Sequence, residues 1–429
     1  ILYSIGSGNP LSHPLPKEWR TILMEQGISV NNFGCAVLWR IHSFIFWGYG
    51  TLQGLKSVYF LLKKQPNLGK YVYFDNLADN NISIDSNRHN ILNWYLQWKN
   101  RNTEINSICH SVDGTLDFKL GEINVIRTDG LPKLKRFQLL KYVVFSTYAV
   151  IYSFVWLFFR PSYGFLIKDV LKLKRVNLAN DADLARDYLF HNSSPYYRPI
   201  WTYAAERKGS RVLFYVYSVN DENCKTKNGY PLPGPWHLIN WPYYLAWDGF
   251  HTNFIKRFVQ YDPIIEVVGP IWFSSSDKCA NIPENSIAVF DVTPVNTSFY
   301  ITLGITCEFY VPTVVNQFLN DIRTVLAESN YIMVHKMKRN KINAHKKYTH
   351  NIKTLKAGSG YQQINPDIDA LQLIQKSMAT ISIPFTSTAL IAMQEGKPSV
   401  YYDPSGTVQQ DNRAAHGIPV LSGIHELRG

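Results

Sequence analysis

The sequence predicts an α/β protein with two doubly wound, mainly parallel sheets. From about residue 185 onward, short runs rich in β-branched and aromatic residues alternate with helical runs, as is typical of parallel strands joined by crossover helices. A polar stretch at 274–285 (SSSDKCANIPEN) interrupts this alternation and is the best candidate for a linker. With 429 residues, the chain is long enough for more than one domain.

The expected elements follow from these runs in chain order. Before the linker, strands are expected at 70–74, 186–191, 211–219, 243–247 and 264–270, and helices at 198–209 and 249–259. After it, strands are expected at 286–292, 331–337, 380–384 and 398–404, and helices at 313–328, 369–379 and 387–396. We therefore predict a first domain at 1–272 and a second at 285–429. Because parallel sheets bind ligands at the carboxyl ends of their strands, two such Rossmann-like domains predict a central cleft.

Composition and charge narrow the range of partners. Hydrophobic residues make up 46% of the chain and charged residues 18%, which excludes intrinsic disorder. Lys and Arg outnumber Asp and Glu by 44 to 32, which favours phosphates or acidic lipids as partners. The basic clusters are local, so we expect no nucleic acid. The five cysteines include no CxxC pair, and the first 20 residues show no signal-peptide pattern; a reducing, cytoplasmic location is therefore expected.

Two hydrophobic segments raise the question of membrane contact. The uncharged run 142–159 has 18 residues between basic flanks, which is the lower limit of length for a membrane span. We expect a helix that is buried or lies on the membrane, with a true span as the alternative. The run 35–51 contains Arg40 and His42, so we expect a core or surface-docking helix. Basic charge and the apolar run 142–159 together predict peripheral attachment to an anionic membrane surface.

The run 384–388 (PFTST) is the clearest local signal. A buried strand ends at a proline-marked turn, and three hydroxyl residues then open a helix that ends near Gly396. Backbone N–H groups at a helix start, together with hydroxyls and the helix dipole, suit phosphate. Ordinary N-capping is the alternative. We predict that Thr386, Ser387 and Thr388 bind phosphate.

A basic run follows the second strand of the second domain. Lys336, Lys338 and Arg339 stand at the end of this strand, where cations can neutralise a diphosphate or a sugar carboxylate. A solvated loop is the alternative. Arg413 and His416, from the loop DNRAAHG, are expected to approach the same cleft.

Two residues of the first domain are candidates for catalysis. Asp248 ends a strand beside Trp247 and Gly249, where a carboxylate can act as a general base or nucleophile. Capping of the following helix is the alternative. His191 ends another strand and is the competing base, because an imidazole titrates near neutral pH. The candidates on the acceptor side are Asn192, Ser193 and Arg198.

Two Asp-x-Asp triplets, at 181–183 and 367–369, raise the question of a metal. Each precedes a predicted helix, where acidic residues interact favourably with the amino terminus. We interpret both triplets as helix starts, and we expect neither a metal nor a cofactor.

Several blocks of the sequence are similar to bacterial surface-polysaccharide biosynthesis proteins named for their PFTS motif. Beside PFTST, the resemblance rests on YFDNLADNN, NWYLQW, LFHNSSPYYRPIWTYAAERKGSR, NWPYYLAWDGF, IEVVGPIWF, GKPSVYYDPSG and DNRAAHGIP. Together these blocks extend over most of residues 70–420.

The resemblance implies a metal-independent glycosyltransferase of the GT-B type that acts in capsule or O-antigen biosynthesis. Residues 1–272 would face the acceptor, a glycan or lipid-linked glycan at the inner membrane, and residues 285–429 would bind a nucleotide-sugar. The PFTST motif also resembles the phosphate loop of bacterial sialyl and Kdo transferases, which implies a CMP-linked acidic sugar as the donor. HKMKRN stands where those enzymes often carry a His-Pro pair. The alternatives are a nucleotide-sugar epimerase of the same fold and a non-catalytic component that binds nucleotide or glycan.

Overall fold

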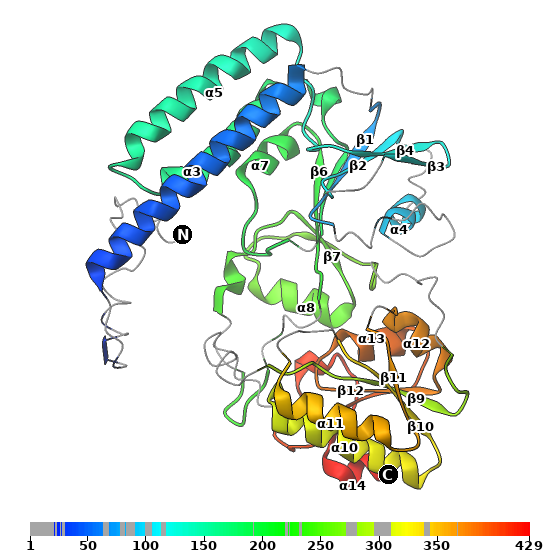
Figure 1. Ribbon diagram of the computed structural model, residues 1–429. Coiled ribbons are helices and arrows are strands. Elements are labelled where there is room, and N and C mark those ends of the chain that lie inside the picture. The colour runs from blue at the N-terminus through cyan, green and yellow to red at the C-terminus, as the bar shows by residue number, and fades with distance from the viewer. Residues whose placement is uncertain are drawn as a thin grey trace. The chain divides into compact units, whose positions relative to one another are not determined.

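The chain forms two compact units, which Figure 1 shows as ribbons. Unit 1 comprises Ile1–Leu77, Thr103–Phe190 and Tyr197–Leu213, and unit 2 comprises Ala78–Asn102, His191–Tyr196 and Phe214–Gly429. The computed structural model describes residues 21, 24–25, 27, 31–62, 68–77, 82, 91–98, 105–112, 117–191, 193–218, 222, 224–230, 234–271, 281–295, 310–338, 344–366 and 368–429.

The larger sheet has eight described strands in the order β3-β4-β2-β1-β5-β6-β7-β8. They are β1 (Tyr71–Asp75), β2 (Ser107–His110), β3 (Phe118–Leu120), β4 (Ile123–Arg127), β5 (Asp187–Phe190), β6 (Arg211–Tyr215), β7 (Tyr243–Ala246) and β8 (Ile264–Val267). β1 pairs in parallel with β2 and β5, and β2 does so with β4. The short β3 pairs with β4 in the antiparallel direction. The carboxyl ends of β1, β2 and β4 therefore meet at the same edge of the sheet.

Three long helices of unit 1 pack against one another. They are α3 (Asn32–Leu62), α5 (Arg136–Leu157) and α6 (Tyr163–Leu178). Glycines make the close contact of α3 and α6 possible. A Cβ atom on Gly54 would lie 2.4 Å from Cδ1 of Leu171, and one on Gly164 would lie 2.1 Å from the carbonyl oxygen of Ser43. Larger side chains at these two positions would push the helices apart.

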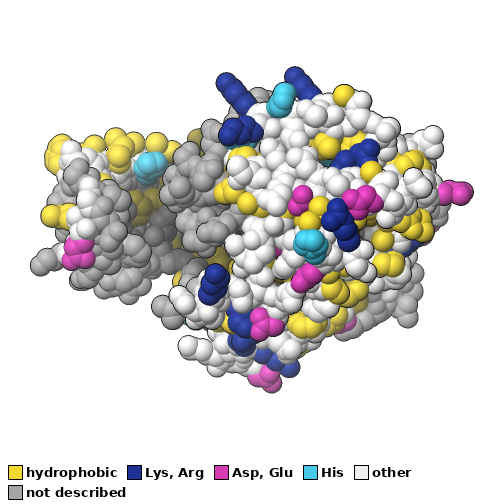
Figure 2. Space-filling model, turned by 90° about the horizontal axis from the view of Figure 1, so that it is seen from below, with side chains coloured by type: hydrophobic (Ala, Val, Ile, Leu, Met, Phe, Trp, Pro, Cys, Tyr) yellow, Lys and Arg dark blue, Asp and Glu magenta, His cyan; other side chains and the backbone are white. Residues whose placement is uncertain are grey.

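Most of the apolar surface of α3 and α5 is exposed. Buried side chains of α5 form one stripe along the helix: Tyr142, Ser146, Ala149, Ser153 and Leu157. On the left of Figure 2, hydrophobic side chains gather on the surface of this helical region. By length and composition α5 could cross a membrane, and only 17% of its most apolar window is buried. The buried alternative for 142–159 is therefore wrong, and the membrane-lying helix stays a prediction. The segment 35–51 lies within α3.

The smaller sheet belongs to unit 2 and is parallel throughout, in the order β11-β10-β9-β12-β13-β14. Its strands are β9 (Ser286–Phe290), β10 (Ile332–Lys336), β11 (Tyr361–Ile364), β12 (Ala379–Ser382), β13 (Ser399–Asp403) and β14 (Val420–Ser422). Its helices are α10 (Pro312–Glu328), α11 (Lys346–Ala357), α12 (Ala370–Lys376), α13 (Ser387–Gln394) and α14 (Gly423–Arg428). α10, α11 and α14 cover one face of this sheet, and α12 and α13 cover the other (Figure 1).

The core of the smaller sheet explains why its periodic sequence folds in this way. Buried apolar residues of α10, among them Val315, Phe318 and Ile322, pack on Ile287 and Val289 of the central strand β9. These α10 residues recur every three or four positions, which puts them on one side of the helix. Burial of this stripe against the sheet is the main stabilising contribution from α10.

The predicted fold class is confirmed: the protein is an α/β protein with two mainly parallel sheets. All strands expected after the linker are present as β9, β10, β12 and β13, whereas β2, β3, β4, β11 and β14 are not among the predictions. Those five strands have three to five residues each, too short for a clear period. Most of the expected linker lies outside the described residues. The domain boundaries and the cleft stay predictions.

Candidate functional site

Asp248 follows β7 and precedes helix α8 (Gly249–Phe258) in unit 2. Its Oδ1 accepts a hydrogen bond of 2.8 Å from the backbone N–H of His251, so Asp248 caps α8. Its Oδ2 lies 2.6 Å from Nδ1 of His416. Capping and interaction with a second functional group therefore occur together: one oxygen fixes the carboxylate on the helix, and the other holds an imidazole from near the end of the chain.

His416 follows the short helix η6 (Arg413–Ala415) and has a φ of 52°, in the left-handed region that non-glycine residues rarely adopt. The side chain of Asn412 accepts a hydrogen bond of 3.1 Å from the backbone N–H of Ala414 and stabilises the turn. The His416 side chain is 4% exposed. Its Nε2 makes no hydrogen bond within the described part of the chain, so this nitrogen is available to another group.

The electrostatics favour an ionised carboxylate beside this imidazole. Burial by itself raises the pKa of the Asp248 carboxyl. The hydrogen bond and charge of His416, with the N–H and charge of His251, outweigh burial and hold this pKa below its usual value. An ionised carboxylate is a hydrogen-bond acceptor only, so Nδ1 of His416 donates the hydrogen bond to Asp248.

The PFTST run forms the turn between β12 and α13 in the same unit. Phe385 has a φ of 63°, which makes the turn abrupt. Thr386 is the N-cap residue of α13, yet its side chain does not cap the helix. Its Oγ1 donates instead to the carbonyl of Ile383 at 3.0 Å. Capping by the Thr386 side chain, which the alternative interpretation requires at this position, is therefore absent.

The two hydroxyl groups after Thr386 differ in their contacts. Oγ1 of Thr388 lies 3.1 Å from Oγ of Ser382 and 3.3 Å from Oγ1 of Thr386. The Ser387 hydroxyl has no hydrogen-bond partner among the described residues, and its side chain is half-buried. The first N–H groups of a helix lack intrahelical acceptors, so Ser387 offers a hydroxyl beside free backbone donors.

Tyr401 of β13 connects this turn with the Asp248 pair. Its hydroxyl donates to the carbonyl of Thr386 at 3.0 Å, and its ring lies 5.7 Å from that of Phe385. Burial, followed by the negative charge of Asp248, raises the pKa of Tyr401. Asp248 is therefore close enough to affect a residue that is hydrogen-bonded to the PFTST turn. The structure brings together Asp248, His416 and the turn, which the sequence placed in two different domains.

His191, the competing candidate, directly follows β5 and is fully buried. Its ring stacks on Tyr215 at 5.4 Å, and neither ring nitrogen has a hydrogen-bond partner within the described residues. Burial lowers the pKa of His191 to about 4. Ser193 donates its hydroxyl to the His191 carbonyl at 2.9 Å. Asn192 lies outside the described residues.

The predicted basic residues have varied environments. Nε of Arg198 donates to Thr202 Oγ1 at 3.1 Å, and its guanidinium pairs with Glu206, so its contacts lie in unit 1 on helix α7 (Ile200–Arg207). Lys336 is buried and donates to the carbonyl of Pro366 at 2.9 Å.

The remaining basic residues lie at the surface or beyond the described part of the chain. Lys338 is exposed, and Arg339 is outside the described residues. The guanidinium of Arg413 lies 4.1 Å from the centre of the Tyr230 ring. Of the predicted phosphate ligands, His416 is the one that the structure places in contact with Asp248.

One buried polar cluster is absent from the predictions. Asp291 follows β9 and accepts a hydrogen bond of 2.5 Å from the Tyr348 hydroxyl. Nε2 of His335 on β10 lies 3.2 Å from the same Asp291 oxygen, and its Nδ1 lies 2.8 Å from the Tyr361 hydroxyl. In the sequence, β9 and β10 are mainly apolar runs. Asp291 directly after β9 and His335 within β10 are polar exceptions to this pattern, and these exceptions could have indicated the cluster.

No group of three or more His, Cys, Asp or Glu side chains among the described residues is placed to hold a metal ion. Asp369 caps α12 and accepts a hydrogen bond of 2.7 Å from the N–H of Leu371, as predicted for a helix start. The other triplet forms the short helix η3 (Asp181–Asp183), and the next element is strand β5, so the prediction that this triplet precedes a helix is wrong.

Comparison with solved structures gives several matches of low identity. S. aureus MnaA in its co-structure with UDP has 10% identity and a TM-score of 0.40, over 84% of this chain and 86% of that one. The wall teichoic acid polymerase TagF has 10% identity and a TM-score of 0.38, over 84% and 79%. TarM has 9% identity and a TM-score of 0.35, over 61% and 50%. No curated protein matches the sequence.

A family model matches the sequence over residues 140–429, well over half of the chain. The matched region contains Asp248, His416, Tyr401 and the PFTST turn, which are the parts of the candidate site that the structure connects. The chain therefore belongs to the family of polysaccharide biosynthesis PFTS motif proteins.

Proposed function

We propose that the protein is a glycosyltransferase of bacterial surface-polysaccharide biosynthesis, which transfers a sugar from a nucleotide-sugar to a glycan acceptor. The observation that carries this proposal is the Asp248–His416 pair, whose Oδ2 and Nδ1 lie 2.6 Å apart in the unit that also contains the PFTST turn. Membership of a polysaccharide biosynthesis family supports the same class of reaction.

The pair has the arrangement of a general base with an orienting carboxylate. Because Nδ1 of His416 donates to Asp248, Nε2 is the acceptor nitrogen of the neutral ring. Nε2 can take the proton of an acceptor hydroxyl while its oxygen attacks the anomeric carbon of the donor sugar. Asp248 stays ionised, since its pKa is held low, and it stabilises the imidazolium that forms. This assigns His416 to proton transfer instead of the phosphate contact expected from the sequence.

The PFTST turn is the proposed binding site for the donor phosphate. The amino terminus of α13, the Ser387 hydroxyl and the helix dipole together favour an anion. These groups can stabilise negative charge on the leaving phosphate without a metal ion. Similarity of the motif to sialyl and Kdo transferase loops supports a CMP-linked acidic sugar as the donor.

The exposed helices of unit 1 support a peripheral position at the cytoplasmic face of the inner membrane. Exposed apolar residues of α5 include Val144, Ile151 and Val155, each more than half exposed. Lysines and arginines flank the helix at 133–141 and 160, where an anionic leaflet attracts them. A helix with this composition can lie in the interface with its apolar side toward the lipid.

The test is a transfer assay with the purified protein. CMP-, CDP-, UDP- and GDP-sugars are supplied with and without a glycan acceptor, and products are identified by mass spectrometry. We expect transfer that requires the acceptor. Conversion of the nucleotide-sugar without acceptor would indicate an epimerase, and binding without turnover would indicate a non-catalytic component. Either result would overturn the proposal.

A further inference from the structure

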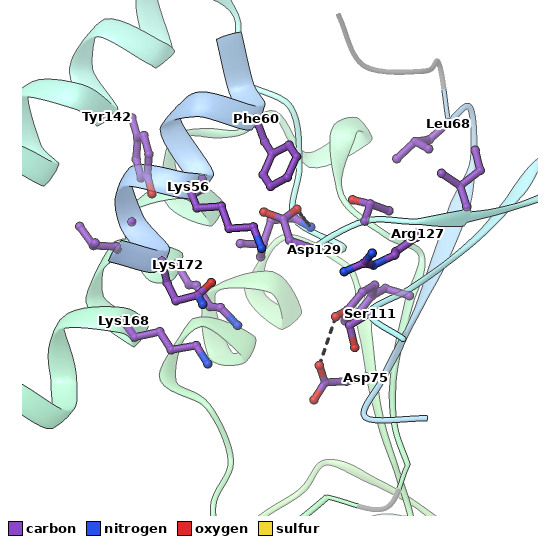
Figure 3. A pocket seen from close by; sticks show the side chains of 18 of the residues that line it. Lys56, Phe60, Leu68, Asp75, Ser111, Arg127, Asp129, Tyr142, Lys168 and Lys172 are labelled. Atoms are coloured by element: carbon purple, nitrogen blue, oxygen red, sulfur yellow. Dashed lines mark hydrogen bonds between the residues drawn. The ribbon is translucent and has the colours of Figure 1, made fainter. Parts of the chain in front are cut away.

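A cavity of about 790 Å³ lies within unit 1, and none of the residues assigned above lines it. Asp75 at the end of β1, Ser111 after β2 and Arg127 at the end of β4 form its floor, and helices α3 and α6 supply the opposite wall (Figure 3). The volume is in the range of small-ligand sites. The position is also typical, because the carboxyl ends of parallel strands are where open α/β sheets bind ligands.

Three lysines from the helices point into this cavity. Lys56 comes from α3, and Lys168 and Lys172 come from α6 (Figure 3). In the described part of the chain none of the three forms a salt bridge or a hydrogen bond; their amino groups instead lie 5.5–5.8 Å from aromatic ring centres. Such contacts stabilise a cation only modestly. The cavity therefore contains three cationic groups that make no direct salt bridge within the described residues, although carboxylates such as Asp75 lie near Lys168 and Lys172.

The acidic residues of the cavity, in contrast, already have partners. Asp129 pairs with Arg175, which is fully buried. Asp117 accepts a hydrogen bond of 2.9 Å from the backbone N–H of Arg127. Asp75 accepts a hydrogen bond of 3.2 Å from the Tyr73 hydroxyl. Each of these carboxylates has a direct hydrogen-bond or ion-pair partner other than the three lysines. Their charges reach Lys172 only through space, so the ammonium groups keep their hydrogen-bonding capacity for a ligand.

The lowered pKa of Lys172 is consistent with a cavity in which positive charges lie close together. Burial, followed by the like charge of Lys168, lowers the pKa of Lys172 despite the nearby carboxylates Asp75 and Asp169. An anion between the two lysines would relieve their repulsion and replace lost solvation. Phosphate and pyrophosphate groups suit such a cluster, because each oxygen can accept hydrogen bonds from a different ammonium group.

The apolar surroundings indicate what the anion is attached to. Tyr49 and Phe60 of α3 line the cavity and are also about half exposed, at 49% and 42%. The same helix carries exposed Leu52, Leu55 and Tyr59, at 65%, 62% and 54%. Cavity and apolar helix surface are therefore continuous. A ligand with a charged head and a long apolar tail would satisfy both.

We infer that this cavity binds the phosphate or pyrophosphate group of a lipid-linked glycan acceptor, with the lipid against the exposed faces of α3 and α5. The inference rests on the proposed glycosyltransferase function, since it identifies the acceptor class for that reaction. Lys56, Lys168 and Lys172 contact the anion. The cavity holds the head group while the lipid stays in the membrane.

The test uses the full chain and phosphatidylcholine vesicles that contain polyprenyl pyrophosphate. Reference vesicles contain phosphatidylglycerol at equal negative charge, or polyprenol, and soluble inorganic pyrophosphate is titrated separately. We expect the protein to bind the polyprenyl pyrophosphate vesicles about tenfold more tightly than the equally charged reference. Equal binding to both kinds of anionic vesicle would overturn the inference. Soluble pyrophosphate that binds as tightly as the lipid would overturn the lipid assignment.

Matched variants test whether the three lysines cause the preference for polyprenyl pyrophosphate vesicles. K168Q/K172Q is expected to lose the tenfold preference, and K56Q, an exposed position where folding is not at risk, to lose part of it. Lys174→Gln is the control, because Lys174 lies on the same helix outside the cavity, over the Phe145 ring. A folded K168Q/K172Q that keeps the preference, or a control that loses as much, would contradict the assignment.

Failure of this inference can be told apart from failure of the proposed function. Asp248→Asn, in unit 2, is expected to bind polyprenyl pyrophosphate vesicles like the unchanged protein while losing transfer. A preference for pyrophosphate lipid without any transfer activity would leave the cavity assignment in place and remove the proposed reaction. Transfer activity without a preference for the pyrophosphate lipid would leave the proposed reaction in place and remove the cavity assignment.

Discussion

The charged groups of the two units differ in whether they form ion pairs. In unit 2, the carboxylate of Asp248 and the imidazole of His416 are paired at 2.6 Å. In unit 1, Lys56, Lys168 and Lys172 line a cavity without a salt bridge within the described residues. An ionised carboxylate that orients an imidazole prepares that imidazole to take a proton from a substrate, whereas cations without a direct salt bridge are stabilised by an added anion. The difference suggests chemistry in unit 2 and substrate retention in unit 1.

The largest effect is expected from Asp248→Asn, because the variant keeps the shape and the helix cap but removes the negative charge. His416 then loses the group that stabilises its protonated form. We expect the transfer rate to fall by about 10²–10⁴, the usual contribution of general base catalysis. Binding of donor and of membranes should not change. The measurement is kcat with saturating donor and acceptor.

Asp411→Asn is the matched control for this variant. Asp411 lies in the same C-terminal loop region and pairs with Lys225, but it is exposed and does not contact His416. Its neutralisation should leave kcat within about twofold of the unchanged protein, because exposed pairs contribute little. A similar loss of rate in both variants would mean that general charge, and not the pair, matters in unit 2.

The second effect concerns His191 and the pH dependence of stability. In the folded protein burial lowers the pKa of His191 to about 4, whereas an unfolded histidine titrates near 6.5. As the pH falls below about 6.5, the unfolded state takes up a proton that the folded state does not, so stability is lost down to about pH 4. This loss amounts to roughly 3 kcal/mol.

His191→Phe removes this titration and keeps an aromatic ring against Tyr215. Between pH 7 and pH 4, its free energy of unfolding should therefore fall by about 3 kcal/mol less than that of the unchanged protein. Urea denaturation at a series of pH values measures the difference. If the variant also loses transfer while Asp248→Asn does not, the base is His191. The Asp248–His416 pair would then not be the catalytic pair of unit 2.

Sequence reasoning found the parts of the site that are local in the chain. Asp248 and the PFTST turn both stand where an apolar strand ends and a helix begins, a pattern visible within ten residues. The pairing of Asp248 with His416 was out of reach, because the two residues are 168 positions apart and the pairing depends on a left-handed turn. The loop DNRAAHG was expected to bind phosphate because its sequence shows basic residues. The sequence does not show that His416 of this loop contacts Asp248.

The unit 1 features were harder to predict for different physical reasons. Hydropathy shows that 142–159 is apolar but not whether other elements cover it, and the structure leaves most of α5 exposed. Lys168 and Lys172 are four positions apart on an amphipathic helix, where lysines commonly face solvent. Their orientation toward the ends of β1 and β4 depends on close contact between α3 and α6 at glycines, and on strands too short to show a period.

A third effect, smaller than the first two, tests membrane binding by unit 1. Ile151 and Val155 lie on one side of α5 and are 60% and 51% exposed, so I151E/V155E should fold normally. If these side chains enter lipid, charged replacements should weaken vesicle binding by roughly tenfold to a hundredfold. Flotation with anionic vesicles measures the change.

Ile264→Glu serves as the control for the membrane variants. Ile264 is also 60% exposed, but it lies on β8 in unit 2. The control should bind vesicles like the unchanged protein. If I151E/V155E floats equally well, the face of α5 is not the anchor. Extraction of the unchanged protein by detergent alone, without release by high salt, would instead indicate a membrane-spanning α5.

The smallest effect is expected at the PFTST turn, where two neighbouring hydroxyl groups separate binding from stability. Ser387 has no hydrogen-bond partner within the described residues, so Ser387→Ala removes nothing that stabilises the folded chain. Thr388 is in contact with Ser382 and Thr386 through its hydroxyl, and Thr388→Ala should lower the free energy of unfolding by about 1 kcal/mol. Nucleotide affinity and melting temperature are measured for both variants.

For Ser387→Ala we expect nucleotide binding to weaken about five- to tenfold at an unchanged melting temperature, since one hydrogen bond to a charged phosphate is lost. Helix α13 keeps its N-cap residue, so weaker binding cannot be attributed to fraying of the helix. Unchanged affinity in this variant, together with a lower melting temperature for Thr388→Ala, would make the turn a structural feature of unit 2. The anion-binding role would then belong to unit 1 alone, and the donor phosphate would need another site.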